Sequence, residues 1–146
     1  MITYQPATSA QYTEFLNLMF DHMADFVQIT LNLLGISMDE FKSLVRTLGQ
    51  VYSINQADKV AGYYWIEEIA QELHLHGIVL KEEYQSKGIG SATIKMLEDQ
   101  YKGQKDFIEL GVHFSNKNAL KLYRKLGFQI ETTMEDLQFH IMRKQL

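Results

Sequence analysis

The spacing of apolar residues predicts that the first third of the chain is helical. A short strand candidate, residues 2–5, ends at the only proline. Apolar residues then recur three and four positions apart over residues 8–34 and again over residues 37–48, as they do on one face of a helix. Each stretch opens with the Ser/Thr and Gln/Glu spacing of a capping box, and a glycine follows each. We therefore expect one strand followed by two helices.

The middle of the chain changes to the period of two that is typical of strands. Residues 51–54 and 59–66 flank a polar turn, which predicts a hairpin. A third strand is predicted over residues 72–80. Strict alternation along it would place Leu73, Leu75 and Val79 on one face and Glu72, His74, His76 and Ile78 on the other.

Helices and strands alternate in the remainder of the chain, and no repeat or linker interrupts them. This order predicts one mixed α/β domain over residues 1–146, built around a sheet that helices flank. The elements expected after the third strand are a glycine loop at 85–91, a helix at 89–101, a strand at 107–112, a helix at 117–126 and closing strands at 128–134 and 137–142.

Composition narrows the class of protein. A chain of 146 residues that is 46% hydrophobic and 22% charged can bury the core of one domain. The net charge of −4 disfavours a nucleic-acid binder. Without cysteine the chain has neither a thiolate metal site nor a cysteine nucleophile. The first residues lack the pattern of a signal peptide and no apolar run is long enough to span a bilayer, so we expect a cytoplasmic protein that does not enter the membrane.

The loop at residues 85–91, Gln-Ser-Lys-Gly-Ile-Gly-Ser, is the strongest candidate for a binding site. It lies between a predicted strand and a predicted helix, where unpaired backbone N–H groups and the helix dipole favour a phosphate. A plain strand-to-helix turn can also use Gly-x-Gly. A dinucleotide fingerprint would need a third glycine where Thr93 stands, and the Gly-Lys-Ser/Thr of a P-loop is absent.

Two motifs resemble those of a known family. Gln85-x-x-Gly88-x-Gly90 resembles the (Arg/Gln)-x-x-Gly-x-(Gly/Ala) motif of GCN5-related N-acetyltransferases. The segment from Asn116 to Phe128, with Ala119, Leu122-Tyr123 and Gly127 between them, is similar to that family's C-terminal signature. The order of elements agrees as well, so the resemblance covers essentially the whole chain.

The resemblance implies a mixed, mostly antiparallel sheet that is splayed where acetyl-CoA binds. A bulged strand would offer backbone groups to the pantetheine arm, and the glycine loop would hold the pyrophosphate. Lys87 is either a phosphate contact or a solvated loop lysine. The cofactor residues implied are Ile78, Val79, Leu80, Gln85, Ser86, Lys87, Gly88, Ile89, Gly90, Ser91, Asn116, Ala119 and Tyr123, the last near the thioester sulfur.

His74 and His76 are candidates for the base that deprotonates an amine. They lie two residues apart on a strand, so both imidazoles face one side, and imidazole titrates near neutral pH. The pair is similar to the strand histidines of arylalkylamine N-acetyltransferases in this family. Glu72 and Glu109 are alternative bases, and all of these residues also suit a half-exposed strand. A His-x-His pair can chelate zinc, but the sequence shows no clear third ligand, so we predict no metal ion.

The resemblance predicts acetyl transfer from acetyl-CoA to a primary amine by direct attack. Tyr123 would protonate the leaving thiolate, unless it is simply a buried helix tyrosine, and the Leu80 N–H would stabilise the oxyanion. The alternatives are a non-catalytic acyl-CoA-binding or sensor domain and a structural module. Some relatives that acetylate protein N-termini carry glutamate at the position of Gly111, so its absence counts against that mechanism.

The sequence leaves the acceptor open between a small-molecule amine and a peptide amine. A homodimer is plausible from the family. The aromatic and methionine residues of the first helices fit core packing, the alternative being that part of them lines an apolar substrate pocket. These residues are Phe15, Met19, Phe20, Met23 and Phe26.

Overall fold

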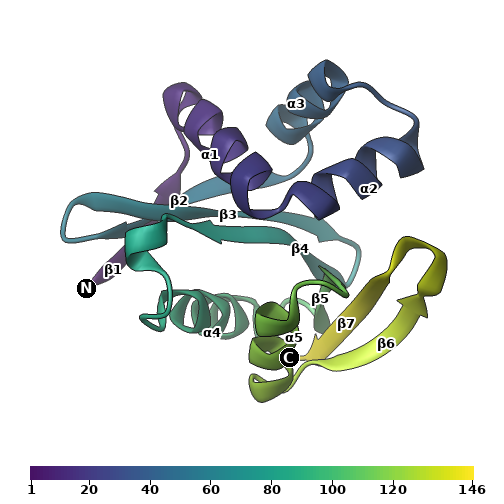
Figure 1. The fold of residues 1–146 in the computed structure, drawn as a ribbon. Coiled ribbons are helices and arrows are strands. Elements are labelled where there is room, and N and C mark those ends of the chain that lie inside the picture. The colour runs from purple at the N-terminus through teal and green to yellow at the C-terminus, as the bar shows by residue number, and fades with distance from the viewer.

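A computed structural model describes residues 1–146 as one seven-stranded sheet flanked by helices (Figure 1). The strand order is β1-β2-β3-β4-β5-β7-β6, and every neighbouring pair is antiparallel except β4 and β5. The predicted mixed, mostly antiparallel α/β fold is therefore confirmed. The elements are β1 (Ile2–Pro6), α1 (Ser9–His22), α2 (Ala24–Leu34), α3 (Met38–Thr47), β2 (Gln50–Gln56), β3 (Lys59–Ile69), β4 (Glu72–Leu80), η1 (Glu82–Tyr84), α4 (Ile89–Tyr101), β5 (Phe107–His113), α5 (Lys117–Lys125), β6 (Gln129–Met134), η2 (Glu135–Leu137) and β7 (Phe139–Gln145).

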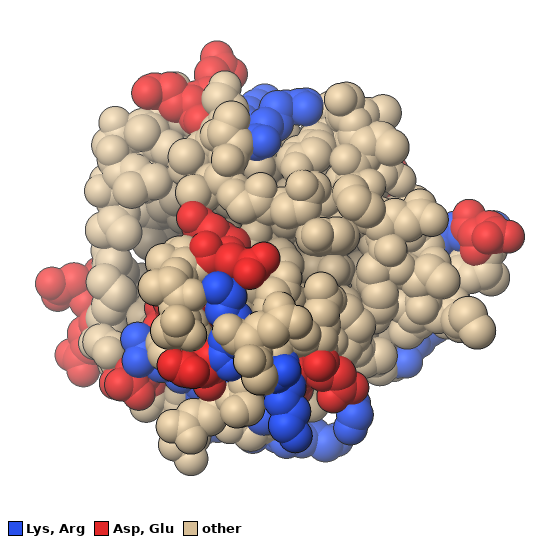
Figure 2. Space-filling model, turned by 180° about the vertical axis from the view of Figure 1, so that it is seen from behind, with Lys and Arg blue, Asp and Glu red and all other residues tan.

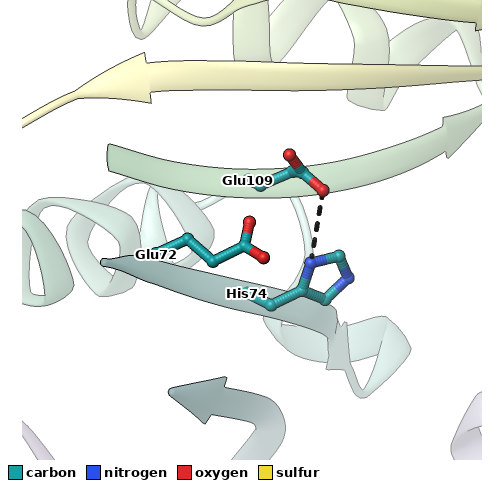
Figure 3. Close-up of side chains that lie close together, drawn as sticks. All are labelled: Glu72, His74 and Glu109. Carbon is teal, nitrogen blue, oxygen red and sulfur yellow. Dashed lines mark ion pairs between the residues drawn. The ribbon is translucent and has the colours of Figure 1, made fainter. Parts of the chain in front are cut away.

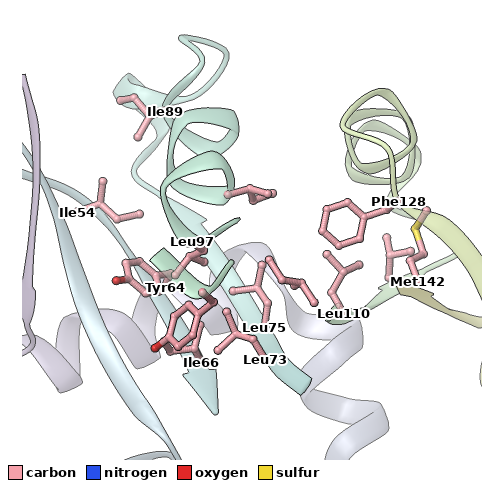
Figure 4. Packing of buried hydrophobic residues seen from close by; sticks show 14 of the residues in the cluster. Ile54, Tyr64, Ile66, Leu73, Leu75, Ile89, Leu97, Leu110, Phe128 and Met142 are labelled. Atoms are coloured by element: carbon pink, nitrogen blue, oxygen red, sulfur yellow. The ribbon is translucent and has the colours of Figure 1, made fainter. Parts of the chain in front are cut away.

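The sheet separates two hydrophobic cores. Helices α1, α2 and α3 cover one face, and α4 and α5 cover the other (Figure 1). On the α4 side, apolar residues of α4 pack against Leu73, Leu75 and Leu110 (Figure 4). On the α1 side, Trp65 and Val79 pack against the N-terminal helices. Burial on both faces explains why the central strands are so apolar.

No helix combines the length and the hydropathy needed to cross a membrane. The surface carries charges of both signs. On the face shown in Figure 2, acidic and basic side chains lie interspersed. This distribution is in keeping with the small net charge of −4.

The N-terminal region contains three helices, so the prediction of two was wrong. Both capping boxes form, with Thr8 and Ser37 as N-caps. The helix expected over residues 8–34 breaks at Met23, whose φ of −130° and ψ of 37° are not helical. The Met23 side chain lies against Gly77, where an added Cβ would stand only 3.0 Å from the methionine Cε. The break thus coincides with a residue that packs on the sheet, and local propensity does not encode that packing.

A β-bulge at His76 corrects the predicted faces of β4. Trp65 pairs with Gly77 and Ile66 pairs with Leu75, which leaves His76 as the extra residue. The extra residue reverses the alternation, so Val79 lies on the α1 side with the histidines, whereas Ile78 packs on the α4 side. The prediction that Ile78 shares a face with His76 was wrong for this reason.

The sheet opens between β4 and β5. These parallel strands pair only over residues 72–75 and 107–110, although β4 continues to Leu80 and β5 to His113. The backbone groups of the second half of β4 on this side therefore have no neighbouring strand. The predicted splay of the sheet is present at the expected place.

Candidate functional site

The opening between β4 and β5 leads into a cavity of about 700 Å³. It passes between the two strands, from the glycine loop, α4 and α5 on one side of the sheet to the junction of α1 and α2 on the other. Of the residues predicted for the cofactor, all except Lys87 line it: Ile78, Val79, Leu80, Gln85, Ser86, Gly88, Ile89, Gly90, Ser91, Asn116, Ala119 and Tyr123. The fold thus collects on one cavity two motifs that lie thirty residues apart in the chain.

The end of β4 presents its backbone to this cavity. The Lys81 N–H donates to the Ala61 carbonyl at 2.8 Å, which fixes the direction of the alternating backbone groups. The backbone N–H and C=O groups of Val79 consequently point toward β3. Those of Ile78 and Leu80 point away from β3, toward the cavity. The Gln85 side chain donates to the Leu80 carbonyl at 3.1 Å. The remaining groups suit an extended ligand that carries amides of its own.

The glycine loop leads into the first turn of α4, where backbone N–H groups are available to an anion. Gly88 is the N-cap of α4, with φ of +79°, and no side chain caps the helix. The first backbone bond of the helix runs from the Ala92 N–H to the Gly88 carbonyl, so the N–H groups of the first turn lie before it without an intrahelical partner. An added Cβ at Gly88 or Gly90 would meet nothing within 4 Å. The glycines leave room for a ligand to approach these donors.

Tyr123 lies on α5 with its ring beside Phe128, at 5.8 Å between centroids. Its hydroxyl makes no hydrogen bond within the protein, and burial raises the pKa of Tyr123 to about 12. The phenol therefore stays neutral near pH 7 and can donate a proton into the cavity. On the same helix the Asn116 side chain accepts from the Ala119 N–H at 3.2 Å, so its amide nitrogen is the group left for a ligand.

His76 brings an imidazole to the cavity from the α1 side. Its ring stacks on Trp65 at 4.3 Å, and its Nε2 lies 2.9 Å from a carboxylate oxygen of Glu67. Because the carboxylate can only accept, Nε2 carries the proton and Nδ1 keeps a free lone pair. Burial, and then the neighbouring His74, lower the pKa of His76 to about 4 although Glu67 opposes the shift. His76 is therefore a neutral imidazole near pH 7.

His74 does not line the cavity but lies behind His76, with 4.5 Å between the ring centroids. Its Nδ1 is 3.7 Å from Glu109, which also accepts from Arg143 at 2.6 Å. Glu72 completes this group (Figure 3), and one of its carboxylate oxygens is buried without a partner. The structure thus brings together the predicted alternatives for the base, and only His76 reaches the cavity.

The side chains that lie close enough to hold a metal ion are Glu72, His74 and Glu109, and this group does not include His76 of the predicted His-x-His pair. Ligand atoms of Glu72, His74 and Glu109 lie within 4.8 Å of one another, because β4 and β5 pair side by side at this point. The three residues can hold a metal ion in principle. Arg143 already supplies a positive charge to Glu109, which lowers the need for one.

Sequence reasoning missed most of the residues that line the cavity at the α1–α2 junction. Of the helix aromatic and methionine residues, Met23 and Phe26 line the cavity, whereas Phe15 and Met19 are fully buried in the core. Phe139 joins them from β7, far away in the chain. Other lining residues found only in the structure include Asp21, His22, Asp25, His113 and Ser115. No local motif marks these positions.

Comparisons with known proteins identify acetyltransferases. The sequence profile of the acetyltransferase (GNAT) family matches residues 17–128. The uncharacterized N-acetyltransferase YvbK of Bacillus subtilis is 32% identical over 90 residues, which are 60% of this chain and 58% of that protein. An uncharacterized N-acetyltransferase of Methanocaldococcus jannaschii is 34% identical over 68 residues, 44% of this chain and 30% of that protein. The chain therefore spans less than two thirds of the length of either relative.

A solved structure shares the whole fold. A GNAT family acetyltransferase from Elizabethkingia anophelis, with acetyl-CoA bound, superimposes with a TM-score of 0.73 at 19% identity. The match covers 99% of this chain and 98% of that chain. At this identity the similarity concerns the fold.

Proposed function

The chain belongs to the acetyltransferase (GNAT) family, and on that premise we propose that it transfers the acetyl group of acetyl-CoA to a primary amine. One observation carries the proposal. The cavity joins the glycine loop, the open backbone of β4 and Tyr123, which are the parts such a transfer needs. The acceptor is an amine of a small molecule or of a peptide.

In this proposal the loop and β4 hold the cofactor. The first-turn N–H groups of α4 bind the pyrophosphate, and the outward N–H and C=O groups of Ile78 pair with the pantetheine amides, which leaves the Leu80 N–H for the reacting carbonyl. The amide nitrogen of Asn116 adds a donor on the α5 side. Lys87 lies outside the cavity lining, so any contact it makes is with an exposed part of the cofactor.

His76 removes the proton from the amine. The Nδ1 lone pair accepts it directly or through a water molecule, and the bond from Nε2 to Glu67 stabilises the positive charge that forms. His74 lies next to His76 and beside Glu109, so it offers the proton a way out of the cavity. This use of both histidines is similar to the role that the sequence suggested for them.

Acetyl transfer then proceeds without a covalent enzyme intermediate. The amine nitrogen attacks the thioester carbon, and the Leu80 N–H donates to the oxyanion. The nitrogen of the tetrahedral intermediate then loses its second proton to solvent through His76 and His74. When the C–S bond breaks, the thiolate takes the proton of the Tyr123 hydroxyl. The products are the N-acetylated amine and CoA, and Tyr123 recovers its proton from solvent.

Replacing Tyr123 by Phe tests the proposal. Because the Tyr123 hydroxyl has no partner in the protein, Tyr123→Phe should leave thermal stability unchanged. Its turnover should fall about 100-fold, the lower range for loss of a general acid, in an assay of thiol release from acetyl-CoA with an amine panel. Tyr52→Phe is the matched control, since Tyr52 is a part-buried tyrosine stacked on Tyr64 and does not line the cavity.

The outcomes separate the alternatives. Unchanged turnover in Tyr123→Phe would remove the acid role of this residue. Heat of CoA binding without thiol release for any amine would favour a non-catalytic acyl-CoA sensor. If the protein neither binds CoA nor releases thiol from acetyl-CoA, the result would favour a structural module.

A further inference from the structure

The cavity has a second mouth on the α1 side of the sheet, opposite the glycine loop. Seven of its lining residues come from the α1–α2 junction and from β7: Asp21, His22, Met23, Ala24, Asp25, Phe26 and Phe139. His76 faces the same side, because the bulge in β4 turns it toward the N-terminal helices. If the proposed function holds, an acceptor that reaches His76 must therefore pass these side chains.

The charges at this mouth are negative. Asp21 and Asp25 are the two formally charged side chains that line the cavity, and both are exposed. Asp21 lies in the last turn of α1, where the negative end of the helix dipole adds to its charge. Asp25 accepts from the Ser115 hydroxyl at 2.9 Å, which holds it beside the cavity. This field attracts a cationic ammonium and repels a carboxylate.

The wall next to these carboxylates is apolar. The rings of Phe26 and Phe139 are stacked, with centroids 6.4 Å apart and an interplanar angle of 26°. Gly111 is required for this arrangement, because an added Cβ would lie 2.1 Å from Cε1 of Phe139. The space that a side chain at position 111 would occupy in β5 thus belongs to an aromatic ring. Met23 extends the same apolar wall.

Resting on the proposed function, we propose that the acceptor is a cationic primary amine with an apolar body and no carboxylate. Asp21 and Asp25 draw in and orient the ammonium, and Phe26 and Phe139 contact the body. The nitrogen loses its proton only at His76, deeper in the cavity. The same two aspartates disfavour free amino acids and acidic peptides as acceptors.

Three acceptors of one shape test this specificity. They are 2-phenylethylamine, L-phenylalaninamide and L-phenylalanine, of which only the last carries a carboxylate. We expect kcat/KM to be at least about 10-fold higher for the first two than for phenylalanine, since like charges face each other in its complex. The amino group of phenylalanine is less basic than that of phenylethylamine, so free-amine availability would favour phenylalanine in that pair. The amine of phenylalaninamide is less basic than that of phenylalanine, so kcat/KM for these two is compared per concentration of unprotonated amine. Equal values for the amide and the amino acid would overturn the proposal.

Two variants assign the effect to residues. Asp21→Asn should lower kcat/KM for phenylethylamine about 2- to 5-fold, as for loss of one exposed charge interaction, and narrow its advantage over phenylalanine. Asp58→Asn in the β2–β3 turn is the control, being a similar substitution away from the cavity. Phe26→Ala should cost about 10-fold for phenylethylamine and less for ethylamine, which lacks the ring. The assignment would be refuted if Asp21→Asn left the kcat/KM ratio of phenylethylamine to phenylalanine unchanged and Phe26→Ala left the ratio of phenylethylamine to ethylamine unchanged.

Binding separates this inference from the proposed function. Calorimetry with the CoA-saturated protein measures affinity for phenylethylamine and phenylalanine without any turnover. If no amine is acetylated but phenylethylamine binds at least about 10-fold more tightly than phenylalanine, the proposed activity fails and the specificity stands. If acetylation occurs with equal efficiency for both, the activity stands and the specificity fails.

Discussion

Acidification should destabilise this fold through one buried histidine. The pKa of His76 falls from an ordinary value near 6.5 to about 4, chiefly because the side chain is only 14% exposed. Between these two values the unfolded chain binds a proton that the native protein does not. Stability is therefore fully present above about pH 6.5 and declines as the pH falls toward 4. The linkage amounts to about 2 kcal/mol at pH 5 and about 3 kcal/mol at pH 4.

Fluorescence of the only tryptophan, Trp65, can be used to follow unfolding. Trp65 stacks on His76, so its fluorescence reports both unfolding and the state of the imidazole. We would measure urea unfolding from pH 7 to pH 4 for the wild type and for His76→Asn. Carboxylates titrate in both proteins, so the difference between the two pH profiles isolates the histidine. The wild type should lose about 3 kcal/mol more than the variant over this range.

The comparison does not depend on the absolute stability of the variant. His76→Asn loses the stacking on Trp65 and the bond to Glu67, so it should be less stable at every pH. His22→Asn, which replaces an exposed histidine, should follow the wild-type profile. Parallel profiles for the wild type and His76→Asn would refute the assignment of a neutral, desolvated imidazole.

Two further predictions concern local structure. Ser37→Ala removes the cap that accepts from the Glu40 N–H and should lower the free energy of unfolding by about 1 kcal/mol, whereas Ser37→Thr should retain most of it; urea titration measures both. Gly111→Ala should cost about 1–3 kcal/mol in the same assay, because its Cβ would overlap the Phe139 ring, and adding Phe139→Leu should recover part of the loss. If Gly111→Ala is as stable as the wild type, the ring does not occupy that space.

Local signals in the sequence predicted much of the fold. Capping boxes at Thr8 and Ser37 mark helix starts through bonds that span three residues, so a short window contains all the information. The glycine loop and the Asn116 cap are local in the same sense. The elements that these signals bound were placed nearly correctly, including the helices that carry the cofactor residues.

The errors occur where a distant contact overrides a local pattern. The helix expected over residues 8–34 breaks at Met23, whose side chain packs beside Gly77 of β4, and nothing in the helical stretch itself indicates that contact. The face assignment in β4 fails because the bulge depends on pairing with β3. The second mouth of the cavity was not predicted for the same reason, since Asp21 and Phe139 are separated by most of the chain and both reach the cavity only in the folded protein.

The bulge at His76 links the fold to the chemistry. In a regular strand, His76 and Ile78 would share one face, and the base would lie with the cofactor on the α4 side. The extra residue moves His76 to the α1 side while Ile78 and Leu80 stay on the α4 side, where Tyr123 also packs. In the proposed mechanism the base therefore meets the acceptor on one face of the sheet, and the acid meets the thiol of the cofactor on the other. In that mechanism the two proton transfers take place on opposite faces of the sheet, and the amine reaches the thioester between the open strands β4 and β5.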